Sequence, residues 1–264
     1  MILAQIGTLE FYPNLDRMHY YMTGNKNVLA VFENPKTPSF QFMVSETNPV
    51  ANIMIKRVEN DLITTMVYET SVATESEGTY TRIKYHGETI TGEMANGHYL
   101  FHVKMGDVDY YSDVFSWNSD SSQLSEFLKF SISCYDFNQG KSPIYRYDTE
   151  NFLYEFYLIV SQENKKEGRS EEDANDLNGY ILPYYSGSSV MRNILVEINR
   201  NLYSLLFHLR TILVNGALTL NYRGNEYSVI DFSTEVASSS ADFDIVYLEI
   251  KFVANNDVIT PINE

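Results

Sequence analysis

The sequence predicts a mainly β protein, α+β overall because of one long helix, and three observations lead to this fold class. Short runs of alternating apolar and polar residues are separated by turn residues about every ten positions. Tyrosine, which suits half-buried sheet surfaces, occurs 21 times in 264 residues. A single stripe of apolar residues at helical spacing lies near residue 200. We expect an N-terminal β-sandwich or small barrel, followed by an antiparallel sheet braced by the helix.

The first predicted domain covers residues 1–117. Its expected strands are residues 28–32, 40–44, 52–58, 62–67, 79–85 and 88–91. Asn60-Asp61 and His86-Gly87 mark two of the turns between them. Many short strands with such turn signals are typical of a sandwich or a barrel.

A β-hairpin is predicted at residues 99–117, where two alternating runs flank Gly106-Asp107. Glycine followed by aspartate at the two central positions favours a type II′ turn. With strict alternation, Tyr111, Phe115 and Trp117 share one face of the second strand, and Tyr110, Ser112 and Val114 share the other.

The Ser-rich residues 118–123 are the expected linker to a second domain at residues 124–264. That domain should contain strands at residues 127–134, 144–160 and 242–253, and a hairpin at residues 218–232. Residues 161–178 have almost no apolar side chains and predict an exposed loop. Residues 189–214 carry the helical stripe, and Asn215-Gly216 is a stop signal after it. At about 1.5 Å per residue, the predicted helix is roughly 38 Å long.

The net charge of −16 argues against direct binding to nucleic acid or to anionic membranes, which require a basic surface. No apolar run reaches the about 20 residues that span a bilayer, and the N-terminus lacks the pattern of a signal peptide. The single cysteine, Cys134, cannot form an internal disulfide and suggests synthesis in a reducing compartment.

No motif in the chain specifies a reaction, so we predict no catalytic residue, no cofactor and no metal. The five histidines do not have metal-ligand spacing. Two sets of oxygen-bearing side chains suggest other chemistry: Asp173, Asn175, Asp176 and Asn178 resemble calcium ligands, and Asp107, Asp109, Asp113, Asp242 and Asp244 could supply hydrolase carboxylates. Neither set has the required pattern.

The tract DYYSDVFSW at residues 109–117 resembles a segment of structural proteins from tailed bacteriophages of Bacteroides-type hosts, including the crAss-like phages. The order of elements downstream is also similar: a sheet, a polar loop, Leu182-Pro183-Tyr184-Tyr185, a helix, a hairpin and a terminal strand. The resemblance implies a tail, baseplate or head–tail ring component located in the virion and made in the bacterial cytoplasm. It brings no catalytic residues with it.

The resulting hypothesis is a non-enzymatic assembly protein whose partners are copies of itself in a ring and other virion tail proteins. The expected contact residues are Tyr110, Tyr111, Phe115, Trp117, Tyr184 and Tyr185, with residues 161–178 as an arm. Two alternatives remain: a carbohydrate- or ligand-binding β-sandwich with exposed aromatic platforms, and a carboxylate-dependent hydrolase.

Overall fold

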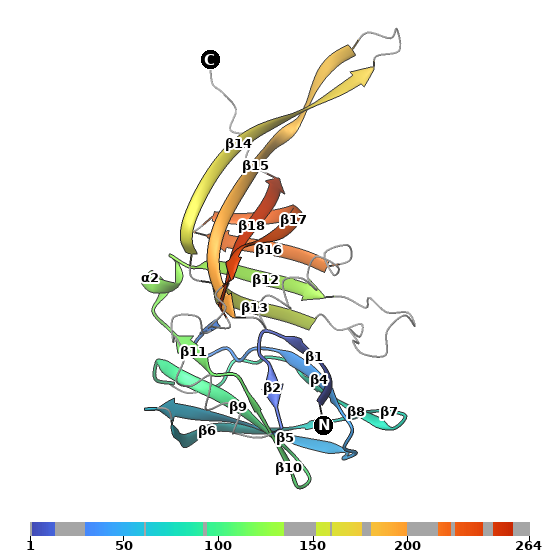
Figure 1. The fold of residues 1–264 in the computed structure, drawn as a ribbon, viewed down its shortest axis with the longest axis vertical. Helices are drawn as coiled ribbons and strands as arrows, with labels where there is room; N and C mark the ends of the chain where they lie inside the picture. Colours follow the sequence, from blue (N-terminus) through green and yellow to red (C-terminus); the bar gives the residue numbers. More distant parts are fainter. Residues whose placement is uncertain are drawn as a thin grey trace.

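The structure, a computed structural model, describes residues 2–13, 30–60, 62–91, 94–134, 152–158, 160–175, 181–199, 216–222, 225–239 and 245–255. The described chain is mainly β, which confirms the predicted class. Its strands form one small and one large sheet, and a long hairpin extends away from the body (Figure 1). The part of the chain that is described contains no helix long and apolar enough to span a membrane.

The small sheet has four antiparallel strands. In spatial order they are β1 (Ile2–Gly7), β4 (Phe40–Val44), β8 (Tyr80–Tyr85) and β7 (Glu75–Glu77). All five residues of β4 are buried, because the strand lies between β1 and β8 and one of its faces meets the large sheet.

The large sheet runs through both halves of the chain. Its C-terminal part contains, in spatial order, β14 (Val160–Asn175), β15 (Ile181–Asn199), β18 (Ile245–Asn255), β17 (Asn225–Ser239), β16 (Gly216–Tyr222), β12 (Leu128–Cys134) and β13 (Phe152–Leu158). Its N-terminal part contains β3 (Val31–Glu33), β11 (Phe115–Asn118), β9 (Gly97–Met105), β10 (Val108–Ser112), β2 (Phe11–Tyr12), β5 (Val50–Glu59) and β6 (Leu62–Ala73).

Strand β9 pairs with other strands along both of its edges and so connects the N-terminal strands of the large sheet. One of its edges pairs with β11 and then with β10, which follow each other along the chain. The opposite edge pairs with β5, and β5 pairs in turn with β6. Within the described residues β6 has no second pairing partner, so the sheet extends from β14 at one end to β6 at the other.

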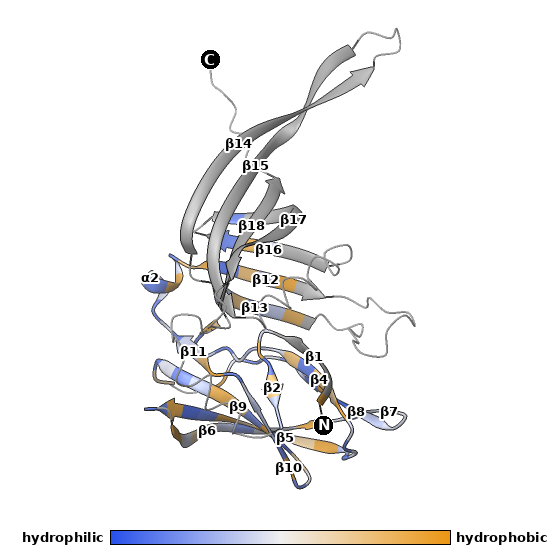
Figure 2. Ribbon diagram, viewed as in Figure 1, coloured by the Kyte–Doolittle hydropathy of each residue, from blue (hydrophilic) through white to orange (hydrophobic). Residues whose placement is uncertain are grey.

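The core of the N-terminal part lies between the two sheets. Phe40 and Phe42 of the small sheet contact Phe101 and Tyr110 of the large sheet, with ring centroids 5.0 and 5.6 Å apart. Hydrophobic residues recur along the strands on both sides (Figure 2). The same cluster continues to Phe130 and Phe156, which stack at 5.0 Å between β12 and β13.

The predicted hairpin around Gly106-Asp107 is confirmed, since Met105 pairs with Val108. Gly106 has a φ of +61° and Asp107 does not have a positive φ, in agreement with a type II′ turn. The predicted faces are wrong. The strand breaks at Asp113-Val114, so Tyr110 joins Phe115 and Trp117 in the main core, while Tyr111 packs in a smaller cluster.

The predicted helix at residues 189–214 is also wrong. Residues 189–199 belong to β15, where every position from Ser189 to Asn199 pairs with β18. The remainder of the prediction, residues 200–214, lies outside the described residues. The only helix in the described part of the chain is α2 (Ser121–Leu124), which is capped by Asp120.

Residues 161–175, expected as a loop, form most of β14, which pairs with β15 along its length. Residues 176–178 are outside the described part. The predicted hairpin at residues 218–232 and the terminal strand correspond to β16–β17 and β18. Residues 88–91 form a single bridge, Lys36 to Thr89, and no strand. The predicted division into two domains at residues 118–123 stays a prediction.

Trp117 is the clearest test of the core. Its ring is fully buried, meets Tyr99 edge-on at 5.2 Å, and donates a hydrogen bond of 2.8 Å from Nε1 to the carbonyl oxygen of Lys36. Trp117→Ala should lower the free energy of unfolding by about 3–5 kcal/mol in chemical denaturation, because it leaves a cavity and an unpaired carbonyl. Tyr80→Ala, at a side chain that is 44% exposed, should change it by less than about 1 kcal/mol. Equal effects of the two substitutions would contradict this core.

Candidate functional site

Two features outside the core could carry a function: a projecting hairpin and a polar pocket where the two parts of the large sheet meet. The hairpin consists of β14 and β15, with 16 and 19 residues, the two longest strands described. At about 3.3 Å per residue these strands are roughly 50–60 Å long. They curve away from the body and end far from the N-terminal sheets (Figure 1).

The outer part of this hairpin has only two strands. Residues 189–196 of β15 lie between β14 and β18, but the described pairing of residues 181–188 is with β14 alone. We call residues 169–175 and 181–188 the arm. Within the described residues, both outer edges of the arm lack a pairing partner. Unpaired backbone groups along an extended edge are a template for a further strand.

The two edges of the arm differ in charge. Residues 169–175 (RSEEDAN) contain one arginine and three acidic residues, whereas residues 181–188 (ILPYYSGS) contain no charged residue. A charged edge discourages pairing with another chain, and an uncharged edge permits it. The arm therefore has one protected edge and one receptive edge.

The structure separates the six predicted contact residues. Tyr184 and Tyr185 lie in the arm, opposite Glu172 and Glu171. Tyr110, Phe115 and Trp117 are fully buried in the core, and Tyr111 stacks on His102 at 4.5 Å. The contact role of these four residues stays a prediction, and for the three buried ones it would have to act through the packing of the core.

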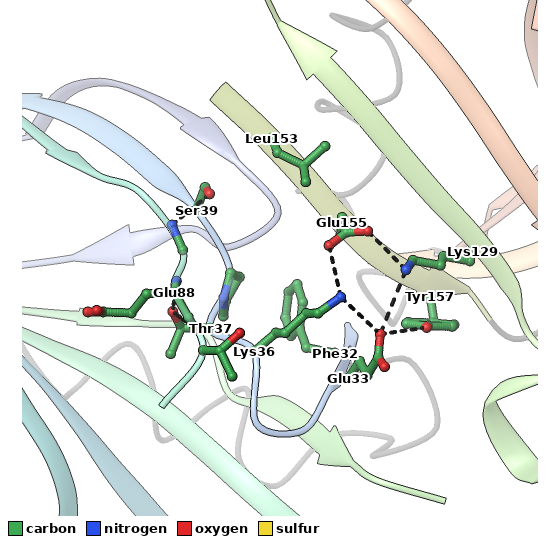
Figure 3. A pocket seen from close by; sticks show the side chains of 13 residues that line it. Phe32, Glu33, Lys36, Thr37, Ser39, Glu88, Lys129, Leu153, Glu155 and Tyr157 are labelled. Carbon is green, nitrogen blue, oxygen red and sulfur yellow. Dashed lines mark hydrogen bonds and ion pairs between the residues drawn. The ribbon is translucent and has the colours of Figure 1, made fainter. Parts of the chain in front are cut away.

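The polar pocket has a volume of about 270 Å³ and lies beside β3. It is lined on one side by residues that follow β3 and β8, including Lys36, Thr37 and Glu88, and on the other by Lys129, Glu155 and Tyr157 of β12 and β13 (Figure 3). β3 runs parallel to β11 and pairs antiparallel with β13 through one position, Val31 with Tyr157.

An ion network spans this junction. Lys129 Nζ lies 2.9 Å from one oxygen of Glu155 and 3.7 Å from Glu33, and Lys36 Nζ lies 3.5 Å from Glu33 and 3.7 Å from Glu155 (Figure 3). The hydroxyl group of Tyr157 donates to Glu33 at 3.3 Å. Two carboxylates and two ammonium groups therefore balance each other across three strands.

The electrostatics of the network favour a structural role. Burial raises the pKa of Glu155, but the hydrogen bond and charge of Lys129, with the charge of Lys36, outweigh it and leave the pKa below its ordinary value. A general acid needs the opposite shift, towards a protonated carboxyl near neutral pH. Burial and the nearby Glu33 charge raise the pKa of Tyr157.

Two of the acidic residues that are hydrolase candidates have separate partners in the described part of the chain. Asp109 Oδ1 lies 2.7 Å from His102 Nε2, and Asp113 accepts a hydrogen bond from the Glu10 amide. Burial lowers the pKa of His102, and Asp109 opposes this shift only in part. Asp242 and Asp244 lie outside the described residues. No group of three metal-ligating side chains occurs among the residues that the structure describes.

The junction was missed in the sequence because its residues come from three distant segments. Glu33, Lys129 and Glu155 have no shared motif and become neighbours only through strand pairing. The sequence predicted part of the arm. Residues 161–178 were expected to form an exposed arm, but as a loop and not as a strand. Comparison of the chain with models of protein families and with curated protein sequences finds no match.

The ion network makes a pH-dependent contribution to stability. The folded pKa of Glu155 lies below its ordinary value of 4.5, so its contribution is present above that pH and is lost as the pH falls through the folded pKa. Glu155→Gln should lower the free energy of unfolding by about 1–2 kcal/mol at pH 7. The difference from the unsubstituted chain should shrink in strongly acidic buffer.

Denaturant titrations of both chains across this pH range measure the effect. Glu69→Gln, which neutralises an exposed carboxylate on β6, should change the free energy of unfolding by less than about 0.5 kcal/mol. A difference for Glu155→Gln that stays constant with pH would contradict the pKa shift.

Gly87 permits the close approach of two chain segments at the pocket wall. Its amide donates to Ser39 Oγ at 2.8 Å, and a Cβ at this position would lie 2.1 Å from the carbonyl oxygen of Thr37. Gly87→Ala should therefore cost about 2–3 kcal/mol of stability, through a backbone shift. Gly78→Ala is the control, with open space and a φ of +66°, and should cost about 1 kcal/mol in the same titration. Equal costs would mean that Thr37 yields readily.

Proposed function

We propose that this chain is a virion structural protein of a tailed bacteriophage, a tail, baseplate or head–tail ring component that assembles through protein–protein contacts. The observation that carries the proposal is the arm, a two-stranded extension at the far end of a continuous sheet, whose outer edges pair with no other described strand. A subunit that reaches its neighbour with such an extension can form a ring if the rotation between subunits closes. The likeness of residues 109–117 to phage structural proteins supports the same role.

In this proposal the N-terminal β-sandwich is the rigid body of the subunit and the C-terminal sheet carries the arm. The ion network at the junction supports it, because the direction of the arm then follows from fixed contacts at β3, β12 and β13. The partners are copies of the chain and other tail proteins, and the location is the virion.

The two alternatives have less support. A carbohydrate platform requires exposed aromatic rings, but Trp117 is buried, and Tyr80 is the only aromatic residue in the exposed class among the described side chains. A carboxylate-dependent hydrolase requires one carboxyl with a raised pKa, and the pKa of Glu155 is shifted in the other direction.

Removal of the arm tests the proposal. Residues 169–188 are replaced by Asn-Gly, a dipeptide that closes a tight hairpin between Gly168 and Ser189, which already pair with each other. The full chain should form rings or concentration-dependent polymers in light scattering and negative-stain images, whereas the shortened chain should stay monomeric. Its thermal unfolding should be unchanged, because the arm does not pair with the described remainder of the molecule.

Assembly of the shortened chain at the same concentrations as the full chain would remove the arm as the basis of the proposal. A full chain that stays monomeric at every concentration would favour a binding module, and a glycan panel monitored by tyrosine fluorescence would then distinguish that role.

A further inference from the structure

Two edges at opposite ends of the large sheet, one in the arm and one on β6, could pair with each other. We propose that the uncharged edge of the arm, residues 181–188 of β15, adds as a strand to the free edge of β6 in a second copy of the chain. This inference rests on the proposed assembly function and names its contact. The sheet of one copy would then continue into the sheet of the next.

The free edge of β6 is the first half of this contact. β6 has 12 residues, pairs only with β5 in the described chain, and carries a single charged residue, Glu69. Leu62 and Met66 are 65% and 49% exposed, the two most exposed large hydrophobic side chains described. A long, nearly uncharged and partly apolar edge is the kind of strand that pairs with another chain.

The pairing of β6 with β5 indicates which part of β6 can accept a further strand. Register shifts opposite Ile55–Val58 interrupt the pairing with β5 near Met66, and bulges of this kind bend an edge away from a partner. From Tyr68 to Ala73 the pairing with β5 is continuous. This uninterrupted stretch presents a regular row of backbone groups for a further strand.

Charge explains why the occupant is the arm of another copy. Two chains with a net charge of −16 repel each other over most of their surfaces. Residues 181–188 carry no charge and β6 carries one, so these edges are places where identical chains can approach at low electrostatic cost. Pro183 lacks an amide donor, and the pairing with β14 shifts register between Tyr185 and Ser188. The regular part of this edge after Pro183 is therefore Tyr184 and Tyr185, where the new ladder is centred.

The positions of the two edges limit how copies of the chain can associate. The arm and β6 lie at opposite ends of the molecule (Figure 1), so one copy cannot satisfy both edges by pairing with itself. Contact between unlike surfaces that is repeated head to tail yields rings or open polymers, whereas two copies that exchange arms reciprocally form a closed dimer.

Site-directed disulfides test the contact. In a Cys134→Ala background, which removes the single native thiol, one population carries Ser71→Cys on β6 and a second, of different mass, carries Ser186→Cys in the arm. Adjacent strands are about 5 Å apart, within disulfide range, whereas the next strand is about 10 Å away and beyond it. On mild oxidation, the Ser71→Cys and Ser186→Cys chains should cross-link with each other and not with themselves.

Two further cysteine variants serve as controls. Ala174→Cys on β14 and Asp107→Cys in the exposed β9–β10 turn should each cross-link to Ser71→Cys at least about tenfold less than Ser186→Cys does. Cross-links of Ser186→Cys with itself would show an arm-to-arm contact, and preferential cross-linking of Ala174→Cys would show pairing through β14. Either result overturns the inference.

A substitution at β6 gives a second, independent readout. Ser71→Asp places a second carboxylate beside Glu69 on the edge, one strand away from the acidic strand of the incoming arm, and should weaken association about tenfold in light scattering. Ser71→Asn has a similar shape without the charge and should assemble like the unsubstituted chain. If assembly needs the arm but is indifferent to Ser71→Asp and gives no cross-link, the β6 contact fails while the assembly function stands; if the full chain never assembles, both fail.

Discussion

The pairing of β3 with two different strands is the constraint on which the rest of the large sheet depends. β3 has three residues, all of which pair with β11, and one of them also pairs with β13. Without this strand the C-terminal strands and the N-terminal strands would be separate sheets. A single ladder position is a weak connection, so the side chains around it must supply most of the stability of the junction.

Those side chains combine burial with charge. Val31, Leu124 and Tyr157 form a small buried cluster against the junction, and Glu33 connects through Lys36 and Lys129 to Glu155. Ion pairs of this kind contribute modest free energy, but they specify how strands meet because each charge has few acceptable neighbours. In the proposed assembly, this junction connects the N-terminal strands to the sheet that carries β14 and β15.

The sequence predicts the β class and several hairpins because turn residues and alternation act locally, as at Gly106-Asp107. The prediction fails where the same residues fit both the spacing of a helix and the alternation of a strand. Residues 189–199 show a helical stripe, but Val196 and Ile198 also alternate with Glu197 and Asn199, and pairing with β14 and β18 selects the strand. The sequence placed Tyr111 on the face of Phe115 and Trp117, whereas Tyr110 lies with them in the core, because the break at Asp113-Val114 reverses the alternation. Glu33 and Glu155 could not be linked without knowing the strand order.

The polar composition of β14 is explained by its position. Residues 169–175 lie in a two-stranded extension, where the strand is held by backbone pairing with β15. Backbone pairing does not require apolar side chains, so a loop and an arm strand look alike in sequence. The same charges leave only the opposite edge of the arm open to a partner. One protected edge and one receptive edge give an association a single direction. In the proposed assembly, a chain with a net charge of −16 needs such directionality, since contacts between identical chains are opposed by charge.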